Sequence, residues 1–328
     1  MRSETAASPA RLRDALHGLR LYQQAARAAP PPPVPLHGHV GRVTLRDYGG
    51  VGPPVVFVPS LINPPSVLDL SEDGSLLRWL ATQGVNPLLV DWGHPAPDER
   101  DLTIAGHVER YLLPLLAGMR EHPALVGYCL GGTMALAAAS AMPVRAVALI
   151  AAPWRFSGFT PEARDGLQQL WRQARPVADA LGMLPMEVLQ TSFWRLDPAR
   201  TVGKFERLGR GGMPPAAVDG FIALEDWAND GPPLTYAAGH GLIHDFVTDD
   251  QTGRGIWDVA GRAVRPETLA CPILDISSTT DRIVPAASAL GLGRGISLGL
   301  GHVGMIVGGR AGALLWEPLA GWLRQAVR

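Results

Sequence analysis

Residues 124–132 constrain the fold of this chain more than any other segment. A short apolar run over 124–126 leads into Gly127-Tyr128-Cys129-Leu130-Gly131-Gly132, and a helical pattern follows to residue 141. Small residues two positions before and two positions after a central nucleophile allow a sharp turn between a strand and a helix. The segment therefore predicts a strand, a tight turn with Cys129 at its tip, and a helix.

Apolar runs and helical patterns alternate on both sides of this turn. The runs cover 39–48, 55–58, 87–90, 146–150 and 272–276, and helical patterns cover 74–82, 104–119 and 131–141. Short buried strands alternating with helices of ten or more residues are typical of a mostly parallel sheet covered on both faces. We predict an α/β fold with a doubly wound sheet, and the turn at Cys129 makes it an α/β-hydrolase fold.

Two segments depart from the alternation. Residues 156–267 carry helical patterns with Gly and Pro breaks, so we expect an inserted helical cap over the active site of a catalytic domain spanning 36–328. Residues 1–35 place Leu and Tyr at helical spacing over 10–29, and four prolines at 30–33 form a stiff spacer. We expect this N-terminal helix to pack on the main domain, or to dock a partner or an apolar granule.

A nucleophilic cysteine needs a base and an orienting carboxylate, which in this fold follow later, each just beyond a strand. Asp281 stands five residues beyond the run 272–276, and His302 follows an apolar run at 296–300. We therefore predict a triad of Cys129, Asp281 and His302. The competing carboxylates are Asp275, which lies within the strand itself, and three residues of the cap, Asp245, Asp249 and Asp250.

An oxyanion formed at the nucleophile needs two N–H donors. The backbone N–H of Leu130 opens the helix after Cys129, and a second donor comes from the loop after an early strand. That loop is Pro59-Ser60-Leu61-Ile62-Asn63-Pro64, so the candidates are the N–H groups of Leu61 and Ile62. The alternative is that this is an ordinary loop between a strand and a helix.

Composition excludes several classes of function. The net charge is −1 and Lys204 is the only lysine, so no basic field exists to bind a nucleic acid. No apolar run is long enough for integral membrane contact, and no secretory signal opens the chain.

With only Cys129 and Cys271, we expect a reducing cytoplasm and no disulfide, and Cys271 should be a buried, inert thiol. No metal-ligand spacing and no phosphate-binding loop occur, so we expect chemistry without a metal or cofactor.

The residues also resemble a known family, the polyhydroxyalkanoate synthases, and most closely their short, class III catalytic subunits. The resemblance runs in order through six motifs between about residues 50 and 310, namely Val58-Pro59-Ser60-Leu61-Ile62-Asn63 with Leu68-Asp69-Leu70, Leu89-Val90-Asp91-Trp92-Gly93-His94-Pro95, the segment around Cys129, Leu224-Glu225-Asp226-Trp227 with Asp230-Gly231-Pro232, Asp281-Arg282-Ile283-Val284-Pro285, and Gly301-His302-Val303-Gly304.

The resemblance implies an acyltransferase that polymerises (R)-3-hydroxyacyl groups from CoA thioesters, with CoA thioester as substrate and no cofactor. Cys129 then carries the acyl group, His302 is its base and Asp281 the carboxylate partner. Within the matching motifs, we expect Asn63 and Trp227 to contact substrate, although Trp227 would also suit the cap core or a dimer surface. The family implies a cytoplasmic protein at polyester granules, working with a second synthase subunit or as a homodimer. The chain lacks the large N-terminal region of the long synthases.

Two other functions remain open on the sequence. Dienelactone hydrolases resemble this chain at the hexapeptide around Cys129. In those enzymes, however, the acid and the histidine follow the nucleophile sooner, and no large cap lies between the nucleophile and the acid. A cysteine-dependent esterase or thioesterase on the same scaffold is the runner-up. A catalytically silent granule-binding or partner-binding protein is the third alternative, and the complete set of Cys129, Asp281 and His302 argues against it.

Overall fold

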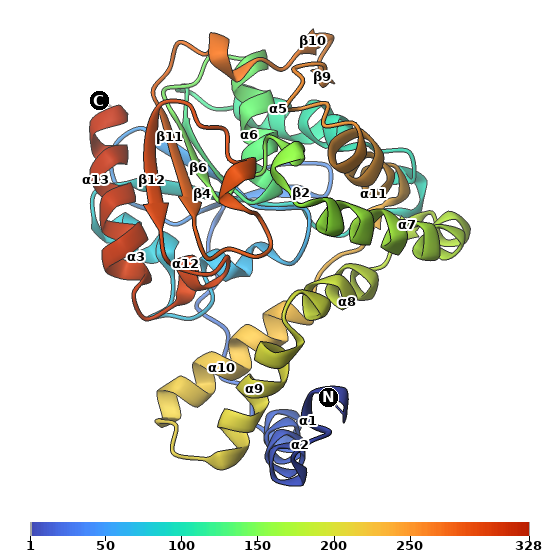
Figure 1. Cartoon of the computed structure of the whole chain (residues 1–328). Coiled ribbons are helices and arrows are strands. Elements are labelled where there is room, and N and C mark those ends of the chain that lie inside the picture. The colour runs from blue at the N-terminus through green and yellow to red at the C-terminus, as the bar shows by residue number, and fades with distance from the viewer. Residues whose placement is uncertain (1, 328) are drawn as a thin grey trace.

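The computed structural model describes residues 2–327 and is built on an eight-stranded sheet (Figure 1). The strand order is β1-β2-β4-β3-β5-β6-β11-β12. The pairs β1–β2 and β2–β4 are antiparallel, and all the other neighbours are parallel. The strands span Leu36–Val40 (β1), Val43–Asp47 (β2), Pro54–Val58 (β3), Asn86–Asp91 (β4), Ala124–Tyr128 (β5), Val147–Ile150 (β6), Ile273–Ser278 (β11) and Arg294–Leu298 (β12). The predicted α/β-hydrolase fold is confirmed.

The first predicted strand, 39–48, is wrong as a single element. The chain forms a hairpin there, in which β1 pairs with β2 and Val40 faces Val43. Gly41 makes the turn with a φ of 55°, a left-handed conformation that glycine adopts without a steric penalty. The apolar pattern runs through the turn, so it did not reveal the break.

Side chains from the two faces of the sheet enter two separate cores. In β3, Val56 and Val58 pack into one core, whereas Val55 and Phe57 pack into the other. This alternation follows from the two-residue period of a strand. Helices cover both faces, as predicted. One face carries α4 (Ile104–His107), η3 (Val108–Leu112), α5 (Leu113–Ala117) and α6 (Leu130–Ala141), and the other carries α3 (Leu76–Thr82), α12 (Gly304–Val307) and α13 (Glu317–Ala326).

The predicted helix over 104–119 is not a uniform α-helix. Its middle, η3, is a π-helical turn between α4 and α5. Two more π-helical turns and several 3-10 turns connect other elements. They are η1 (Pro65–Leu68), η2 (Pro97–Glu99), η4 (Phe156–Gly158), η5 (Leu242–Thr248, π), η6 (Pro266–Thr268), η7 (Ala286–Ser288) and η8 (Gly312–Trp316, π).

The segment between β6 and β11 is mainly helical. Its helices are α7 (Pro161–Leu181), α8 (Met186–Leu196), α9 (Pro198–Arg210), α10 (Pro215–Ala228) and α11 (Tyr236–Gly241). It also holds two pairs of two-residue strands, β7 (Met183–Leu184) with β8 (Leu234–Thr235) and β9 (Asp258–Val259) with β10 (Arg262–Ala263), which the sequence did not predict. Figure 1 shows α8, α9 and α10 leading away from the sheet into a protruding lobe.

The N-terminal helices pack on this lobe. Helix α1 (Arg2–Thr5) and helix α2 (Pro9–Gln24) lie beside α9 (Figure 1). Helix α2 therefore packs on the domain that spans 36–328, and it does so on the inserted helices. A Cβ at Gly18 would lie 1.9 Å from the Phe205 carbonyl oxygen, and a Cβ at Gly209 would lie 1.9 Å from that of Asp14. The two glycines therefore let the helix backbones touch.

Polar contacts surround this helix crossing. Arg11 pairs with Glu206 at 2.8 Å, and Arg210 pairs with Asp14 at 3.1 Å. The Tyr22 hydroxyl donates to Asp226 at 2.7 Å. The N-terminal helix and the inserted helices thus form one packed unit. Within residues 2–327, no helix is long and apolar enough to cross a membrane.

Candidate active site

Cys129 occupies a strained turn between β5 and α6. Its φ of 55° and ψ of −133° lie outside the regions that a residue with a side chain ordinarily adopts. The turn closes because its neighbours lack side chains. A Cβ at Gly127 would lie 2.2 Å from the Gly132 Cα, and a Cβ at Gly131 would lie 2.0 Å from the Val58 carbonyl oxygen. The predicted strand, turn and helix are present at this position.

Asp281 and His302 come from two loops at the same end of the sheet. Asp281 follows β11, and His302 follows β12. His302 Nδ1 and Asp281 Oδ2 are 2.6 Å apart, and the aspartate side chain has no exposed surface. The other oxygen of Asp281 accepts from the N–H groups of Ile283 at 2.8 Å and Val284 at 3.0 Å. These donors fix the carboxylate and keep it satisfied although it is buried.

The imidazole of His302 is hydrogen-bonded to Asp281 and lines the same cavity as Cys129. Burial disfavours the charged ring, but the negative charge at Cys129 and the bond to Asp281 outweigh it and raise the pKa of His302 to about 10. The raised pKa favours the protonated ring beside Asp281. The structure thus brings the three predicted residues together in the order sulfur, imidazole, carboxylate.

Tyr128 supports the histidine, a contact the sequence analysis did not anticipate. Its ring stacks on the His302 ring with centroids 5.0 Å apart, and its hydroxyl donates to the His302 carbonyl oxygen at 3.2 Å. Burial raises the pKa of the Tyr128 hydroxyl well above its usual value, so it stays neutral. The aromatic residue directly before the cysteine was the only sequence signal for this contact.

The competing carboxylates are placed elsewhere. Asp275 lies within β11, where one oxygen accepts from the Gly291 N–H at 2.6 Å, and burial raises the pKa of its carboxyl. Asp250 accepts from the Phe156 N–H at 2.7 Å, inside the inserted segment. Neither carboxylate is bonded to His302 or lines the cavity beside Cys129.

The candidate oxyanion donors lie at the start of α6 and in the loop after β3. Leu130 is the first residue of α6, and the first N–H groups of a helix have no partner within it. Of the two candidates in the loop after β3, Ile62 donates its N–H to the Ser60 hydroxyl at 3.0 Å. No partner of the Leu61 N–H occurs within the described residues. Among residues 2–327 the Leu61 N–H is therefore free, whereas Ile62 lines the cavity beside Cys129, and the oxyanion roles of Leu130, Leu61 and Ile62 stay predictions.

Asn63 and Trp227 join the early loop to the inserted helix α10. The Asn63 amide donates to the Asp230 carbonyl oxygen at 3.2 Å, and the Trp227 indole donates to the Pro64 carbonyl oxygen at 2.8 Å. Asn63 has a φ of 63°, so this contact fixes an unusual backbone conformation. Both residues also line the cavity beside Cys129, and their contact with substrate stays a prediction.

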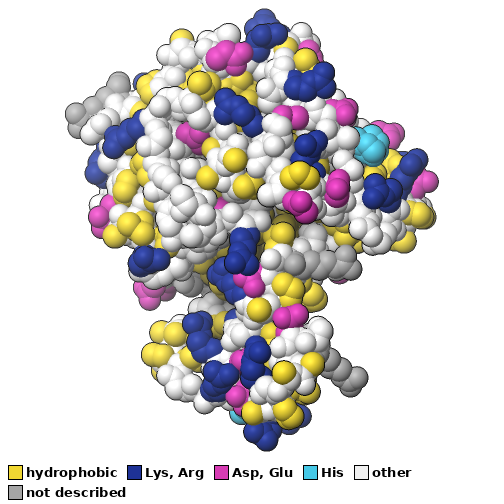
Figure 2. Space-filling view, viewed as in Figure 1, with side chains coloured by type: hydrophobic (Ala, Val, Ile, Leu, Met, Phe, Trp, Pro, Cys, Tyr) yellow, Lys and Arg dark blue, Asp and Glu magenta, His cyan; other side chains and the backbone are white. Residues whose placement is uncertain are grey.

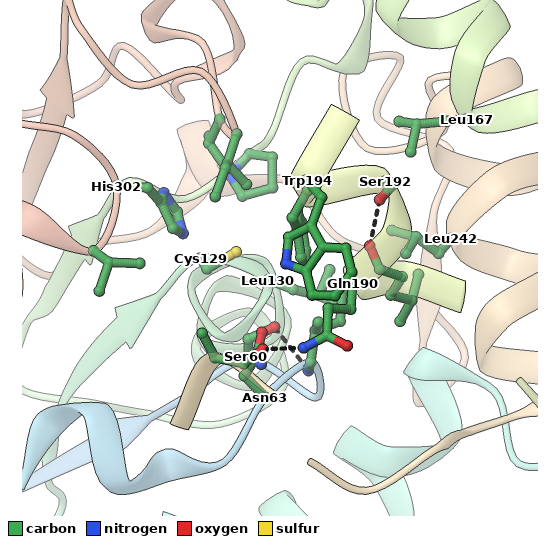
Figure 3. A pocket seen from close by; sticks show the side chains of 18 of the residues that line it. Ser60, Asn63, Cys129, Leu130, Leu167, Gln190, Ser192, Trp194, Leu242 and His302 are labelled. Atoms are coloured by element: carbon green, nitrogen blue, oxygen red, sulfur yellow. Dashed lines mark hydrogen bonds between the residues drawn. The ribbon is translucent and has the colours of Figure 1, made fainter. Parts of the chain in front are cut away.

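A mostly apolar cavity of about 290 Å³ opens above Cys129. Cys129, Leu130, Ser60 and His302 lie at its catalytic side, and helices of the inserted segment close the other sides (Figure 3). In Figure 3, Trp194 and Gln190 face the cysteine across this space. The apolar lining includes Phe156, Phe159, Leu167, Leu189, Phe193, Leu242 and Val247. The inserted segment thus borders the site, as a cap would.

Cys271 differs from the expectation of a buried thiol. It lies just before β11 and is half-buried. Burial raises the pKa of its thiol, which leaves it protonated and poorly nucleophilic. Within residues 2–327, no group of three or more His, Cys, Asp and Glu side chains is arranged to hold a metal ion.

A model of the alpha/beta hydrolase family matches residues 55–307. Among solved structures, a putative epoxide hydrolase from Pseudomonas aeruginosa is similar with a TM-score of 0.55 and 16% identity, covering 92% of this chain and all of that chain. An esterase from Exiguobacterium antarcticum is similar with a TM-score of 0.52 and 15% identity, covering 86% of this chain and 95% of that one. These likenesses show the fold.

Curated relatives indicate the family more narrowly, and each bears the name poly(3-hydroxyalkanoate) polymerase subunit PhaC. The Synechocystis relative is 30% identical, covering 83% of this chain and 78% of its own length. The Haloferax mediterranei relative is 28% identical over 83% of this chain, which spans only 58% of that relative. The Allochromatium vinosum relative is 27% identical, covering 83% of this chain and 81% of its own. The fold, the turn at Cys129 and these relatives together show that the chain belongs to the polyhydroxyalkanoate synthase family of the α/β hydrolases.

Proposed function

We propose that this protein transfers (R)-3-hydroxyacyl groups from CoA thioesters to Cys129 and from there to a growing polyester. The observation that carries the proposal is the hydrogen-bonded pair of His302 and Asp281 next to Cys129 at an apolar cavity. The names of the curated relatives support the polymerising outcome. No metal or cofactor takes part in the proposed reaction.

In the first half-reaction, the Cys129 thiolate attacks the carbonyl carbon of the thioester. The N–H groups of Leu130 and Leu61 stabilise the resulting oxyanion. The bond from carbon to the CoA sulfur then breaks, and the His302 imidazolium gives its proton to the departing thiolate. Asp281 remains ionised and stabilises the cationic ring before this transfer.

In the second half-reaction, the hydroxyl of another 3-hydroxyacyl group attacks the acyl group on Cys129. His302, now neutral, accepts the hydroxyl proton, the new ester bond forms, and the Cys129 thiolate departs beside the regenerated imidazolium. Exchange of one thioester for another is nearly balanced in free energy, so the acyl group on Cys129 stays activated. A serine nucleophile would form a less reactive ester at this step.

Hydrolysis is the alternative outcome of the same geometry, because water can replace the attacking hydroxyl. Purified protein incubated with (R)-3-hydroxybutyryl-CoA should release CoA while the acyl groups accumulate in oligomers. Mass spectrometry of the acyl products, together with thiol titration of CoA, separates the outcomes. Free 3-hydroxybutyrate in amounts equal to the CoA released would contradict polymerisation and support a thioesterase. Failure to release CoA, with no acyl group on Cys129, would contradict the acyl-transfer mechanism itself.

The proposal also includes the setting in which the reaction takes place. We place the protein in the cytoplasm at polyester granules, as a homodimer or with a second synthase subunit. Large apolar side chains exposed on the inserted and N-terminal helices support contact with an apolar surface, among them Leu16, Leu181 and Trp194. Co-sedimentation with isolated polyester granules tests this placement, and a protein that stays in the supernatant would contradict it.

A further inference from the structure

A second cavity adjoins the apolar one at His302. It has a volume of about 240 Å³ and is bordered by the N-terminal part of α9, by α10, and by the loops that carry Asp281 and His302. Cys129 lines the first cavity but not the second, whereas His302 and Trp227 line both. The two spaces therefore share a wall that includes the imidazole proposed to protonate the departing thiolate and, from α9, Thr201 and Lys204.

The second cavity is lined by more charged side chains than the first, where Lys204 is the one Arg, Lys, Asp or Glu among the described lining residues. Its cations are Arg200, Lys204 and Arg282, and its carboxylates are Asp197 and Glu225. Lys204 pairs with Glu225 at 2.6 Å, and Arg282 pairs with Asp197 at 2.7 Å. These two pairs neutralise each other and leave Arg200 in excess. Figure 2 shows basic side chains gathered where the protruding lobe joins the main body.

Arg200 is placed next to the catalytic loop. A Cβ at Gly301 would lie 3.4 Å from its Nη1 atom and 3.9 Å from its Nη2 atom, so the guanidinium lies over the residue before His302. Among residues 2–327, the Arg200 guanidinium has no hydrogen bond and no ion pair. A guanidinium presents five N–H donors in a fork that matches phosphate oxygens. Arg200 is therefore a cation with free donors beside the reacting histidine.

We propose that this second cavity, which we call the Arg200 cleft, binds the phosphate groups of the CoA carrier, with Arg200 as the main contact and with Arg282, which pairs with Asp197 at the start of the same helix, as a second cation. The inference rests on the proposed function. The acyl group occupies the apolar cavity, and the scissile bond lies between Cys129 and His302. The carrier then leaves on the His302 side, where its thiolate receives the proton and its phosphates meet the guanidinium.

The distribution of charge supports a carrier that leaves on the His302 side. The whole chain has a net charge of −1, so its overall field does not attract an anion, and a local cation must do so. Arg282 keeps free donors beyond its bond to Asp197, and its side chain is 64% exposed at the cleft. The apolar cavity contains no comparable pair of arginines, and it would desolvate phosphate oxygens without replacing their hydrogen bonds.

The experiment compares a substrate that carries the phosphates with one that lacks them. Arg200→Gln should raise the KM for (R)-3-hydroxybutyryl-CoA about tenfold, because charge-assisted bonds to phosphate are lost. The same variant should leave the KM for the N-acetylcysteamine thioester of the same acid unchanged, since that carrier has no phosphate. Arg207→Gln is the matched control, because Arg207 is an exposed arginine on the same helix that does not line the cleft.

Direct binding separates this inference from the proposed reaction. Calorimetric titration with CoA, dephospho-CoA and pantetheine should show that Arg200→Gln weakens only the ligands that carry phosphate, and the difference between CoA and dephospho-CoA assigns the 3′-phosphate or the diphosphate to Arg200. If the variant weakens all three ligands equally, or if Arg207→Gln has the same effect, the Arg200 cleft is not the phosphate site. If CoA binds through Arg200 but no acyl transfer occurs, the proposed reaction fails while the site stands.

Discussion

His302 Nδ1 lies 2.6 Å from Asp281 Oδ2, and the carboxylate that makes this contact is fully enclosed by protein. The two residues follow adjacent parallel strands, β11 and β12, so the sheet brings their loops to one edge. Because the second oxygen of Asp281 is held by two backbone N–H groups, the carboxylate cannot turn away from the ring. This arrangement keeps the imidazole oriented toward Cys129 and stabilises its protonated form.

The two cysteines should differ in their effect on activity. Cys129→Ala should reduce CoA release by at least about 10⁴-fold, because only binding and the oxyanion donors remain without the nucleophile. Cys271→Ala is the matched control and should keep nearly full activity, since Cys271 lies before β11 and lines neither cavity. Limited iodoacetamide near neutral pH, followed by peptide mass spectrometry, should label Cys129 first. Faster labelling of Cys271 would refute the mechanism at its first step.

Asp281→Asn should lower the pH at which His302 loses its proton. In the native protein the pKa of His302 is raised to about 10, so the ring stays cationic from neutral pH up to that value and maintains a charge beside the sulfur. Without the carboxylate this pKa falls, and the ring loses its proton at lower pH. Imidazole signals followed by NMR should then show His302 protonated from pH 7 to 9 in the native protein and losing its proton at lower pH in the variant. Parallel profiles in the two proteins would show that Asp281 does not set the charge on the ring.

The glycines around Cys129 should tolerate no side chain. Gly131→Ala places a Cβ 2.0 Å from the Val58 carbonyl oxygen, so the start of α6 must shift away from β3. We expect a loss of about 2 to 3 kcal/mol of unfolding free energy and a loss of activity. Gly166→Ala is the control, because this glycine of α7 has open space around its Cα and alanine favours a helix by up to about 1 kcal/mol. Thermal unfolding of both variants tests the contrast, and equal melting temperatures would contradict it.

The contact between α2 and α9 should depend on Gly18. An alanine there would put its Cβ 1.9 Å from the Phe205 carbonyl oxygen and force the helices apart. This should lower the free energy of unfolding by about 2 kcal/mol. Trypsin should then cleave more quickly after Arg27, which in the native protein is bonded to Asp226 of α10. Gly203→Ala, on α9 with open space around it, is the control and should not change the rate. If Gly18→Ala leaves cleavage unchanged, the N-terminal helix is not held by this crossing.

The sequence alone identified the strand, the turn and the helix around Cys129, because glycine spacing at a strained turn is a local requirement. It also selected Asp281 and His302, since parallel strands bring the loops at their carboxyl ends to one edge of a sheet. The role of the three residues in catalysis stays a prediction, as do the contacts of Asn63 and Trp227 with substrate.

Only the tertiary structure decided how the helices outside the sheet are arranged. The pattern in residues 10–29 predicted an amphipathic helix but contained nothing to show that Gly18 would meet Gly209, because contacts between distant segments leave no period in the sequence. The same holds for Arg200, whose guanidinium reaches the loop of His302 from another element. Local sequence determines which elements form, whereas the packing of α2, α9 and α10 depends on close approach and charge pairing that exist only after the chain has folded.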